Sequence, residues 1–177
     1  MKSPRSIVLI GMMGAGKSSV GRYLERRTGL QRFDTDELIS AWFGKSIPEI
    51  FTEIGEEQFR SAETEILAGV SPPQPAIIVT GGGIVLRRPN IQHLKRLGTV
   101  VWLDADTGTL FERATRRGNR PLLKTDNPRA TLSKIAAERA PLYEAASDIR
   151  IDTTNLPHEQ VGELILDEVE ARTAGQV

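Results

Sequence analysis

Short runs of consecutive apolar residues recur along the chain, and stretches with helical spacing separate them. The runs span Ile7–Ile10, Ala76–Val79 and Thr99–Leu103, with two further candidates at Leu30–Phe33 and Asp148–Ile151. Runs that are apolar throughout are typical of parallel strands buried on both faces of a sheet. Parallel strands need crossover connections, which are usually helices. The pattern therefore predicts an α/β fold built on a parallel sheet.

Helical spacing of apolar residues predicts the connecting helices. After the first strand, Val20 and Leu24 lie on one helix face. The stretch from Ser46 to Val70 contains no predicted strand, and Ser46 with Glu49 has the spacing of a capping box, so we expect a helical insertion there. Later helices are predicted by Leu110, Phe111 and Ala114, by Leu132, Ile135 and Ala136, and by Val161, Leu164, Ile165 and Val169.

The length of the chain bounds its domain organisation. At 177 residues and 39% hydrophobic, it can bury one compact core. The polar segment Gly118–Pro128 contains two prolines, which predicts a mobile loop. We expect a single domain over residues 1–177, with an insertion at about 34–70 and a loop at about 118–128.

Charge and cysteine content exclude several classes of protein. The chain has 23 basic and 23 acidic residues, so its formal net charge at pH 7 is zero. Proteins that bind nucleic acids or membrane surfaces usually carry a basic excess, so we expect neither partner. The absence of cysteine excludes disulfides and thiolate zinc sites, and the two histidines lie too far apart in sequence to suggest a metal site. A reducing cytoplasm fits this composition.

One motif predicts a nucleotide site. A phosphate-binding loop pattern occurs in Gly11-Met12-Met13-Gly14-Ala15-Gly16-Lys17-Ser18, after a predicted strand and before a predicted helix. Backbone N–H groups of such a loop and the N-terminus of the helix attract phosphate oxygens. We expect Lys17 to reach the outer phosphates and the Ser18 hydroxyl to ligate Mg²⁺. The chain lacks the guanine-reading Asn-Lys-x-Asp of GTPases, and glycines replace the metal-binding Asp that many NTPases carry after a later strand.

Two further segments follow predicted strands, at the edge of the sheet where open α/β folds bind ligands. Gly81–Gly83 has no side chains, so its backbone can approach a substrate closely; a loop that needs left-handed dihedrals is the alternative. Asp34 and Asp36 follow the run Leu30–Phe33, and either one could simply cap the next helix. Beside a phosphate loop, one carboxylate can instead hold a metal through water while the other orients an acceptor hydroxyl and receives its proton.

Arg60 and Glu63 are three residues apart on the predicted insertion helix, so they share a face and can pair. One interpretation is an exposed ion pair worth under about 1 kcal/mol. The other is that Glu63 orients Arg60, so that its guanidinium group binds a substrate carboxylate.

Together these residues resemble the pattern of the shikimate kinase family, over Ile7 to about Asp152. The resemblance rests on seven ordered motifs, which are far more specific than any one of them. They are the phosphate loop, Asp34-x-Asp36, Ser46-Ile47-x-Glu49-Ile50-Phe51, Gly55-Glu56-x-x-Phe59-Arg60-x-x-Glu63, Gly81-Gly82-Gly83, Arg120-Pro121-Leu122-Leu123 and Arg139-x-Pro141-Leu142-Tyr143.

The resemblance implies a three-layer α/β/α fold with a five-stranded parallel sheet, of the P-loop NTPase class and the nucleoside monophosphate kinase type. A helical substrate-binding insertion and a lid loop would complete it. The implied reaction transfers the γ-phosphoryl group of ATP to the 3-hydroxyl of shikimate, giving shikimate 3-phosphate and ADP in aromatic amino-acid biosynthesis. Mg²⁺ is the implied cofactor, ATP and shikimate are the implied partners, and we expect a cytoplasmic monomer.

The resemblance also implies roles for single residues. ATP would be held by Gly14, Ala15, Gly16, Lys17, Ser18, Ser19, Arg113 and Arg120. Ser18 and, through water, Asp34 would hold the metal. Arg113 would pack against adenine, with Asp152–Pro157 completing that pocket, and Arg120 would lie in the lid. Shikimate would be bound by Asp36, Arg60, Gly81, Gly82, Gly83 and Arg139, with Asp36 as the candidate base and both arginines on the carboxylate. Lys17, Asp36 and Arg120 would be the catalytic residues.

Two other functions remain open at this point. A kinase for another hydroxy-carboxylic acid, such as gluconate, would need the same arginines and aspartate. A nucleotide-binding regulatory module without phosphotransfer is the second alternative, and the joint presence of Lys17, Ser18, Asp36 and Arg120 argues against it.

The zero net charge divides into two opposed stretches. From Asp34 to Glu65 there are 9 acidic and 2 basic residues, a balance of −7, and from Arg113 to Arg139 there are 8 basic and 2 acidic residues, a balance of +6. The chain has 17 arginines, and we expect Arg60, Arg113, Arg120 and Arg139 to be functional and the other thirteen to lie on the surface.

Overall fold

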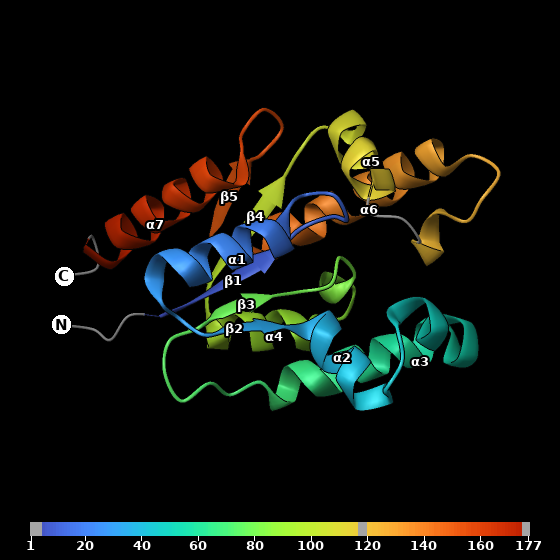
Figure 1. Cartoon of the computed structure of the whole chain (residues 1–177), viewed down its shortest axis with the longest axis horizontal. Helices are drawn as coiled ribbons and strands as arrows, with labels where there is room; N and C mark the ends of the chain where they lie inside the picture. Colours follow the sequence, from blue (N-terminus) through green and yellow to red (C-terminus); the bar gives the residue numbers. More distant parts are fainter. Residues whose placement is uncertain (1–4, 117–119, 175–177) are drawn as a thin grey trace.

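The strands form one parallel sheet in the computed structural model, which describes residues 5–116 and 120–174 (Figure 1). They are β1 (Ser6–Ile10), β2 (Arg32–Asp34), β3 (Ile77–Val79), β4 (Gly98–Asp104) and β5 (Ile149–Asp152). Their order across the sheet is β2-β3-β1-β4-β5, and each neighbouring pair is parallel. The five predicted strand positions are confirmed to within a few residues.

Helices cover both faces of this sheet. They are α1 (Lys17–Thr28), α2 (Thr35–Phe43), α3 (Ile47–Gly69), α4 (Arg88–Leu97), α5 (Thr107–Arg116), α6 (Pro128–Ala146) and α7 (His158–Ala174). α1 packs with α7 on one face, and α4 and α6 pack on the other. The expected three-layer α/β/α fold is therefore confirmed. Over the ranges that the structure describes, none of these helices has the length and apolar character needed to cross a bilayer.

The central strand explains the arrangement of the core. All five residues of β1 are buried, and they pair with β3 on one side and β4 on the other. Burying an apolar strand on both faces requires helices above and below it, which α1 and α4 provide. The carboxyl end of β1 then delivers the chain directly into the phosphate-loop sequence.

A second, smaller apolar cluster lies outside the sheet. Its buried members are Ile39, Ile50 and Phe59, from α2 and α3. The Glu49 carboxylate accepts hydrogen bonds from the Ser46 backbone N–H and hydroxyl at the start of α3. Figure 1 shows α2 and α3 together, beyond the carboxyl ends of the strands. The predicted helical insertion thus has an apolar cluster of its own.

Three features differ from the sequence prediction. β2 spans Arg32–Asp34 instead of Leu30–Phe33, because it is a half-buried edge strand that pairs only with β3 and so lacks a continuous apolar run. Helix α4 was not predicted, since only Asn90 and Leu94 of its ten residues are buried. The insertion helix is interrupted at Gly55, whose φ of 75° and ψ of 172° are not helical.

The predicted loop Gly118–Pro128 is only partly described. Gly118 and Asn119 lie outside the described residues. Pro121–Leu123 forms a 3₁₀ turn, η2, in which the Leu123 N–H donates to the Arg120 carbonyl, and Pro128 already belongs to α6. The mobility of this loop stays a prediction.

Candidate active site

The phosphate-loop sequence forms a tight connection between β1 and α1. Gly16 immediately precedes α1 with a left-handed φ of 96°. Gly14 has a φ of 86°, and a Cβ atom there would lie 2.3 Å from the Leu110 carbonyl oxygen. Both positions therefore require glycine, for conformation and at Gly14 also for space. The loop ends at the N-terminus of α1, which carries no acidic residue in its first turn and attracts anions.

Lys17 reaches back across this loop from the first position of α1. Its Nζ atom donates to the carbonyl oxygens of Gly11 at 2.7 Å and Met12 at 2.9 Å. Burial lowers the pKa of Lys17 to about 8, and the nearby Asp36 carboxylate opposes this shift. The ammonium group is thus buried beside the loop, and the nearby carboxylates do not offset the cost of burying its charge. This environment favours an anionic ligand.

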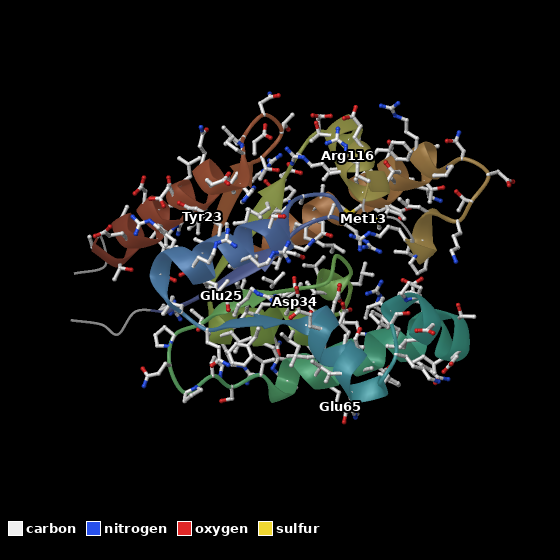
Figure 2. All side chains as sticks on the ribbon, viewed as in Figure 1. Met13, Tyr23, Glu25, Asp34, Glu65 and Arg116 are labelled. Carbon is white, nitrogen blue, oxygen red and sulfur yellow. The ribbon has the colours of Figure 1, made fainter. Side chains whose placement is uncertain are left out.

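A cavity of about 390 Å³ opens over the loop. Its lining includes all the residues predicted to bind nucleotide or metal, which are Gly14, Ala15, Gly16, Lys17, Ser18, Ser19, Asp34, Arg113 and Arg120. Asp36, Gly81 and Gly82 also border it. Figure 2 labels two of the lining residues, which are Met13 in the loop after β1 and Asp34 at the end of β2.

Arg113 fixes the far wall of the cavity. Its guanidinium group donates to the Thr153 hydroxyl at 3.1 Å and to the carbonyl oxygens of Thr153 and Thr154 at 2.9 and 3.1 Å. The same segment continues into Leu156 and Pro157, which line the cavity. Arg113, Leu156 and Pro157 thus line the same cavity, and the packing of Arg113 against adenine stays a prediction.

Asp34 and Asp36 lie on the opposite wall. The Oδ1 atom of Asp34 accepts the Asp36 backbone N–H at 3.1 Å, so Asp34 caps α2, as one of the two interpretations predicted. Its carboxylate nevertheless borders the cavity. Burial raises the pKa of Asp34, and the neighbouring Asp36 raises it further. Burial also raises the pKa of Asp36, while Lys17, Arg120 and Arg60 oppose the change.

A smaller cavity of about 80 Å³ adjoins the first. It is bordered by all the residues predicted to bind the acceptor, which are Asp36, Arg60, Gly81, Gly82, Gly83 and Arg139. Met13, Asp36, Gly81, Gly82 and Arg120 line both cavities, so these five residues mark the boundary between them.

Arg60 is held at this second cavity by a buried ion pair. Its Nη1 atom lies 2.9 Å from Oε2 of Glu63, whose side chain is 0% exposed. The interpretation of this pair as an exposed surface contact is therefore wrong. Arg60 also lies over the rings of Phe51 and Phe59, at 5.7 and 5.2 Å from their centroids. A guanidinium group held on three sides is pre-organised to bind a carboxylate.

The glycine segment approaches these charged groups closely. A Cβ atom on Gly81 would lie 2.7 Å from Oε1 of Glu63 and 2.8 Å from Oδ1 of Asp36, and one on Gly83 would lie 2.1 Å from Nη1 of Arg60. On the other side, Arg139 donates from Nη1 to the Gly82 carbonyl at 3.0 Å. The close-approach interpretation of this segment agrees with the geometry, since Gly81 and Gly83 have no left-handed φ.

Replacing Gly83 with Ala should therefore displace the Arg60 guanidinium. The φ and ψ of Gly83, −94° and 1°, are open to alanine, so the effect is steric. We expect a loss of affinity for the acceptor of about tenfold, with affinity for nucleotide unchanged, because a displaced guanidinium loses about one charged hydrogen bond. Gly69→Ala is the matched control, since nothing lies within 4 Å of its added Cβ. Calorimetric titration of both variants with each ligand measures this, and equal acceptor affinity in both would contradict it.

Sequence reasoning missed several residues at the site. Arg32 was assigned to the surface, but its side chain is only 14% exposed and its Nη1 atom lies 3.3 Å from Asp34, so that assignment is wrong. Arg116, also assigned to the surface, has a side chain 78% exposed yet borders the first cavity. His158 borders the same cavity, and Tyr143 donates a hydrogen bond to Gly82. Tyr143 belongs to the motif that begins at Arg139, so the sequence marks it, but the motif suggested no role for it.

The donors present suit a hard cation that brings some of its own ligands. Within residues 5–116 and 120–174, no three His, Cys, Asp or Glu side chains are grouped to hold a metal. Ser18, Asp34 and Asp36 supply oxygen atoms to the first cavity. Such a set fits Mg²⁺, which keeps waters and binds through phosphates and one or two protein oxygens.

Comparisons with known proteins agree with this geometry. The family model described as "Shikimate kinase" matches residues 13–170. The shikimate kinase of Thermodesulfovibrio yellowstonii is 41% identical over 172 residues, which cover 97% of this chain and 99% of that protein. A solved shikimate kinase from Acinetobacter baumannii in complex with shikimate is 34% identical, with a TM-score of 0.91 over 97% of this chain and 95% of the other.

A more distant structure shares the fold alone. A gluconokinase from Sinorhizobium meliloti is 22% identical, with a TM-score of 0.60 over 99% of this chain and 97% of the other. The match to the family model and the identity to its members are much stronger than this likeness. On these grounds, the chain belongs to the shikimate kinase family.

Proposed function

We propose that this chain is a shikimate kinase, which transfers the γ-phosphoryl group of ATP to the 3-hydroxyl of shikimate. The observation that carries the proposal is the pair of adjoining cavities, one over the phosphate loop and one between Arg60 and Arg139. A donor and an acceptor bound in them would meet at Asp36 and Arg120, which border both. Phosphoryl transfer depends mainly on such positioning and on charge stabilisation.

In this proposal, Asp36 acts on the acceptor hydroxyl. Its carboxylate lies between Lys17, Arg120 and Arg60, whose charges lower its pKa against the effect of burial. It therefore remains able to accept a proton while being held next to the transferred group. Asp36 orients the 3-hydroxyl and receives its proton as the oxygen attacks phosphorus.

Cationic groups surround the transferred phosphoryl group. Lys17 would bind the outer phosphates together with the loop N–H groups. Arg120 borders both cavities, and its Nε atom is buried without a hydrogen-bond partner among the described residues. It is thus available to stabilise negative charge in the transition state. Closure of the segment around Arg120 would also keep water away from ATP.

Ser18 and, through water, Asp34 would hold Mg²⁺. The ion, when bound, neutralises charge on the phosphate oxygens. Arg32 contacts Asp34 and Glu37 at once, so it restrains the Asp34 carboxylate.

The wider organisation belongs to the same proposal. Residues 1–177 would act as one kinase domain, in which α2 and α3 bind the acceptor and the segment around residues 118–128 is the lid. The enzyme would be a cytoplasmic monomer that binds neither nucleic acid nor membrane.

The decisive experiment is ADP release, coupled to a reporter enzyme, with ATP, Mg²⁺ and one acceptor at a time. Shikimate, gluconate and a nucleoside monophosphate are compared, and the product of the active acceptor is identified by NMR. We expect turnover with shikimate alone. Turnover with gluconate instead would establish the second candidate. No turnover with any acceptor would overturn the kinase proposal.

Replacing Arg60 with Lys should raise KM for shikimate by about 10–100-fold, because the charge stays but at least one charged hydrogen bond is lost. KM for ATP should change less than about twofold, since Arg60 borders only the smaller cavity. Steady-state kinetics in both substrates measures the two constants. Arg22→Lys, at an exposed position of α1, is the control. Equal rises in both constants would remove Arg60 from the carboxylate site.

A further inference from the structure

Tyr143 is a buried residue that contacts Gly82, one of the residues lining the smaller cavity. The side chain lies in α6, is 0% exposed and stacks on Trp102 of β4, with 5.8 Å between ring centroids and 26° between planes. Its Oη atom donates to the Gly82 carbonyl oxygen. Burial raises the pKa of Tyr143 to about 12, so this hydroxyl remains a donor throughout the physiological range.

The Gly82 carbonyl oxygen receives a second hydrogen bond. Arg139 donates to it from Nη1 at 3.0 Å. Arg139 and Tyr143 are four residues apart in α6, so both side chains leave the same face of one helix. A carbonyl oxygen has two lone pairs and can accept both bonds. Gly82 therefore links a rigid aromatic pair to a guanidinium group of the acceptor cavity.

Gly82 lies where a change in its placement affects both cavities. Gly82 borders both cavities, and a Cβ atom on it would lie 3.4 Å from the Met13 nitrogen and 3.8 Å from Nη1 of Arg139. The peptide group between Gly82 and Gly83 is planar, so holding the Gly82 carbonyl also sets the direction of the Gly83 N–H. The ends of the segment have bonds of their own, since the Gly81 N–H donates to Thr35 Oγ1 and the Gly81 and Gly83 carbonyls accept from the N–H groups of Ile84 and Leu86, whereas the Gly82 carbonyl is held by the Tyr143 and Arg139 bonds.

We propose that Tyr143 is a positioning residue for the acceptor. Its hydroxyl anchors the Gly82 carbonyl, and this anchor sets both the placement of Gly81–Gly83 and the orientation of the Arg139 guanidinium. The inference rests on the proposed function, because it assigns Gly81–Gly83 and Arg139 to shikimate binding.

A Tyr143 hydroxyl that only stabilised the fold would give a different result from one that positions the acceptor site. Replacing Tyr143 with Phe keeps the ring, its volume and its stacking on Trp102, and removes only the hydroxyl. If that group served stability alone, the variant would have a lower melting temperature and unchanged kinetic constants. If it positions the acceptor site, the Gly82 carbonyl keeps only its bond from Arg139, and small displacements of binding groups reduce substrate affinity.

The test compares two variants that each lose one phenolic hydroxyl. Tyr143→Phe is expected to raise KM and the calorimetric Kd for shikimate by about 5–20-fold, with KM for ATP within about twofold of wild type. Tyr23→Phe is the matched control, since the Tyr23 hydroxyl donates to Glu163 at 2.6 Å between α1 and α7 (Figure 2). It should leave both constants unchanged.

Arg139→Lys, alone and combined with Tyr143→Phe, provides a second readout. If both residues act through Gly82, their effects on KM for shikimate should be less than multiplicative. Multiplicative effects, or a Tyr143→Phe variant that loses only thermal stability, would overturn the inference. Equal rises in KM for ATP and shikimate would also overturn it. Wild-type protein inactive on shikimate would instead overturn the proposed function, so the two failures are distinguishable.

Discussion

Asp36→Asn should reduce kcat for shikimate phosphorylation by about 10²–10⁴-fold, the range that general base catalysis contributes. Asparagine keeps the size and most hydrogen bonds of the carboxylate but cannot take a proton from the acceptor. The Asp36 side chain lies where the two cavities meet. It also lies against Gly81, since a Cβ atom added there would be 2.8 Å from its Oδ1 atom. Its removal should therefore affect the chemical step more than the binding of either substrate.

We expect the Asp36→Asn variant to bind ATP and to fold much as the wild type does. Burial raises the pKa of Asp36 against the opposing charges of Lys17, Arg120 and Arg60, so the charged form is disfavoured at this position and we expect the neutral amide to leave the melting temperature close to that of wild type. We expect ATP affinity within about threefold of wild type, because in the proposed function Asp36 acts on the acceptor hydroxyl and the phosphates are bound by the loop and Lys17. Single-turnover kinetics, ATP titration and thermal melting separate the three quantities.

Glu65→Gln is the matched control for Asp36→Asn. It also removes one carboxylate charge from the acidic stretch, but Glu65 is exposed and points outward from α3 (Figure 2). This variant should keep full activity. An Asp36→Asn enzyme with more than about one tenth of wild-type kcat would exclude Asp36 as the general base.

Lys17→Met should lower kcat/KM for ATP by about 10²–10³-fold, the effect expected when one pre-organised charge at a transferring group is lost. Lys17 is the buried cation at the start of α1, and burial lowers its pKa from 10.5 to about 8. Its Nζ atom now donates to the carbonyl groups of Gly11 and Met12, and in the proposed complex phosphate oxygens would be the stronger, charged partners. Methionine has a similar length but carries no charge.

The fold should tolerate this second change. A buried ammonium group is itself unfavourable, so we expect a melting temperature within about 5 °C of wild type. Lys134→Met is the control, because the Lys134 side chain is 77% exposed and lies 3.9 Å from Glu138 on α6. If Lys17→Met retained wild-type kcat/KM, the phosphate-binding role of Lys17 would be contradicted. If Lys134→Met lost activity as well, the loss could not be assigned to the phosphate site.

Much of the fold could be predicted because its signals are local. The apolar runs of β1 and β4 are continuous, since both strands are buried on both faces, and the structure moves their ends by only one residue. The signals of β2 and α4 are weaker for the opposite reason. β2 is a half-buried edge strand, and α4 buries few residues, so neither imposes a clear pattern on the sequence.

Some features of the site are likewise visible in the local sequence, and others depend on tertiary packing. The phosphate loop is one contiguous motif, so its position between a strand and a helix could be read directly from the sequence. The Arg60–Glu63 pair was recognisable from its spacing, but its burial was not, because burial depends on α3 packing against Gly81 and Gly83. Arg32 was assigned to the surface because no motif includes it. Asp34 and Glu37 are near it in sequence, but only the packing of β2 beside α1 and α2 brings their carboxylates and that of Glu25 around its guanidinium group.

The sequence alone therefore determined the α/β class, the phosphate loop and the ordered motifs that mark the family. Each of these is a local pattern, set by the hydrophobic periodicity or the backbone freedom of neighbouring residues. Only the tertiary structure decided which distant groups meet. It joined Tyr143 to Gly82 across 61 positions, and Arg113 to Thr153 across 40. Such contacts depend on how whole helices and strands pack, and no spacing within one segment encodes them.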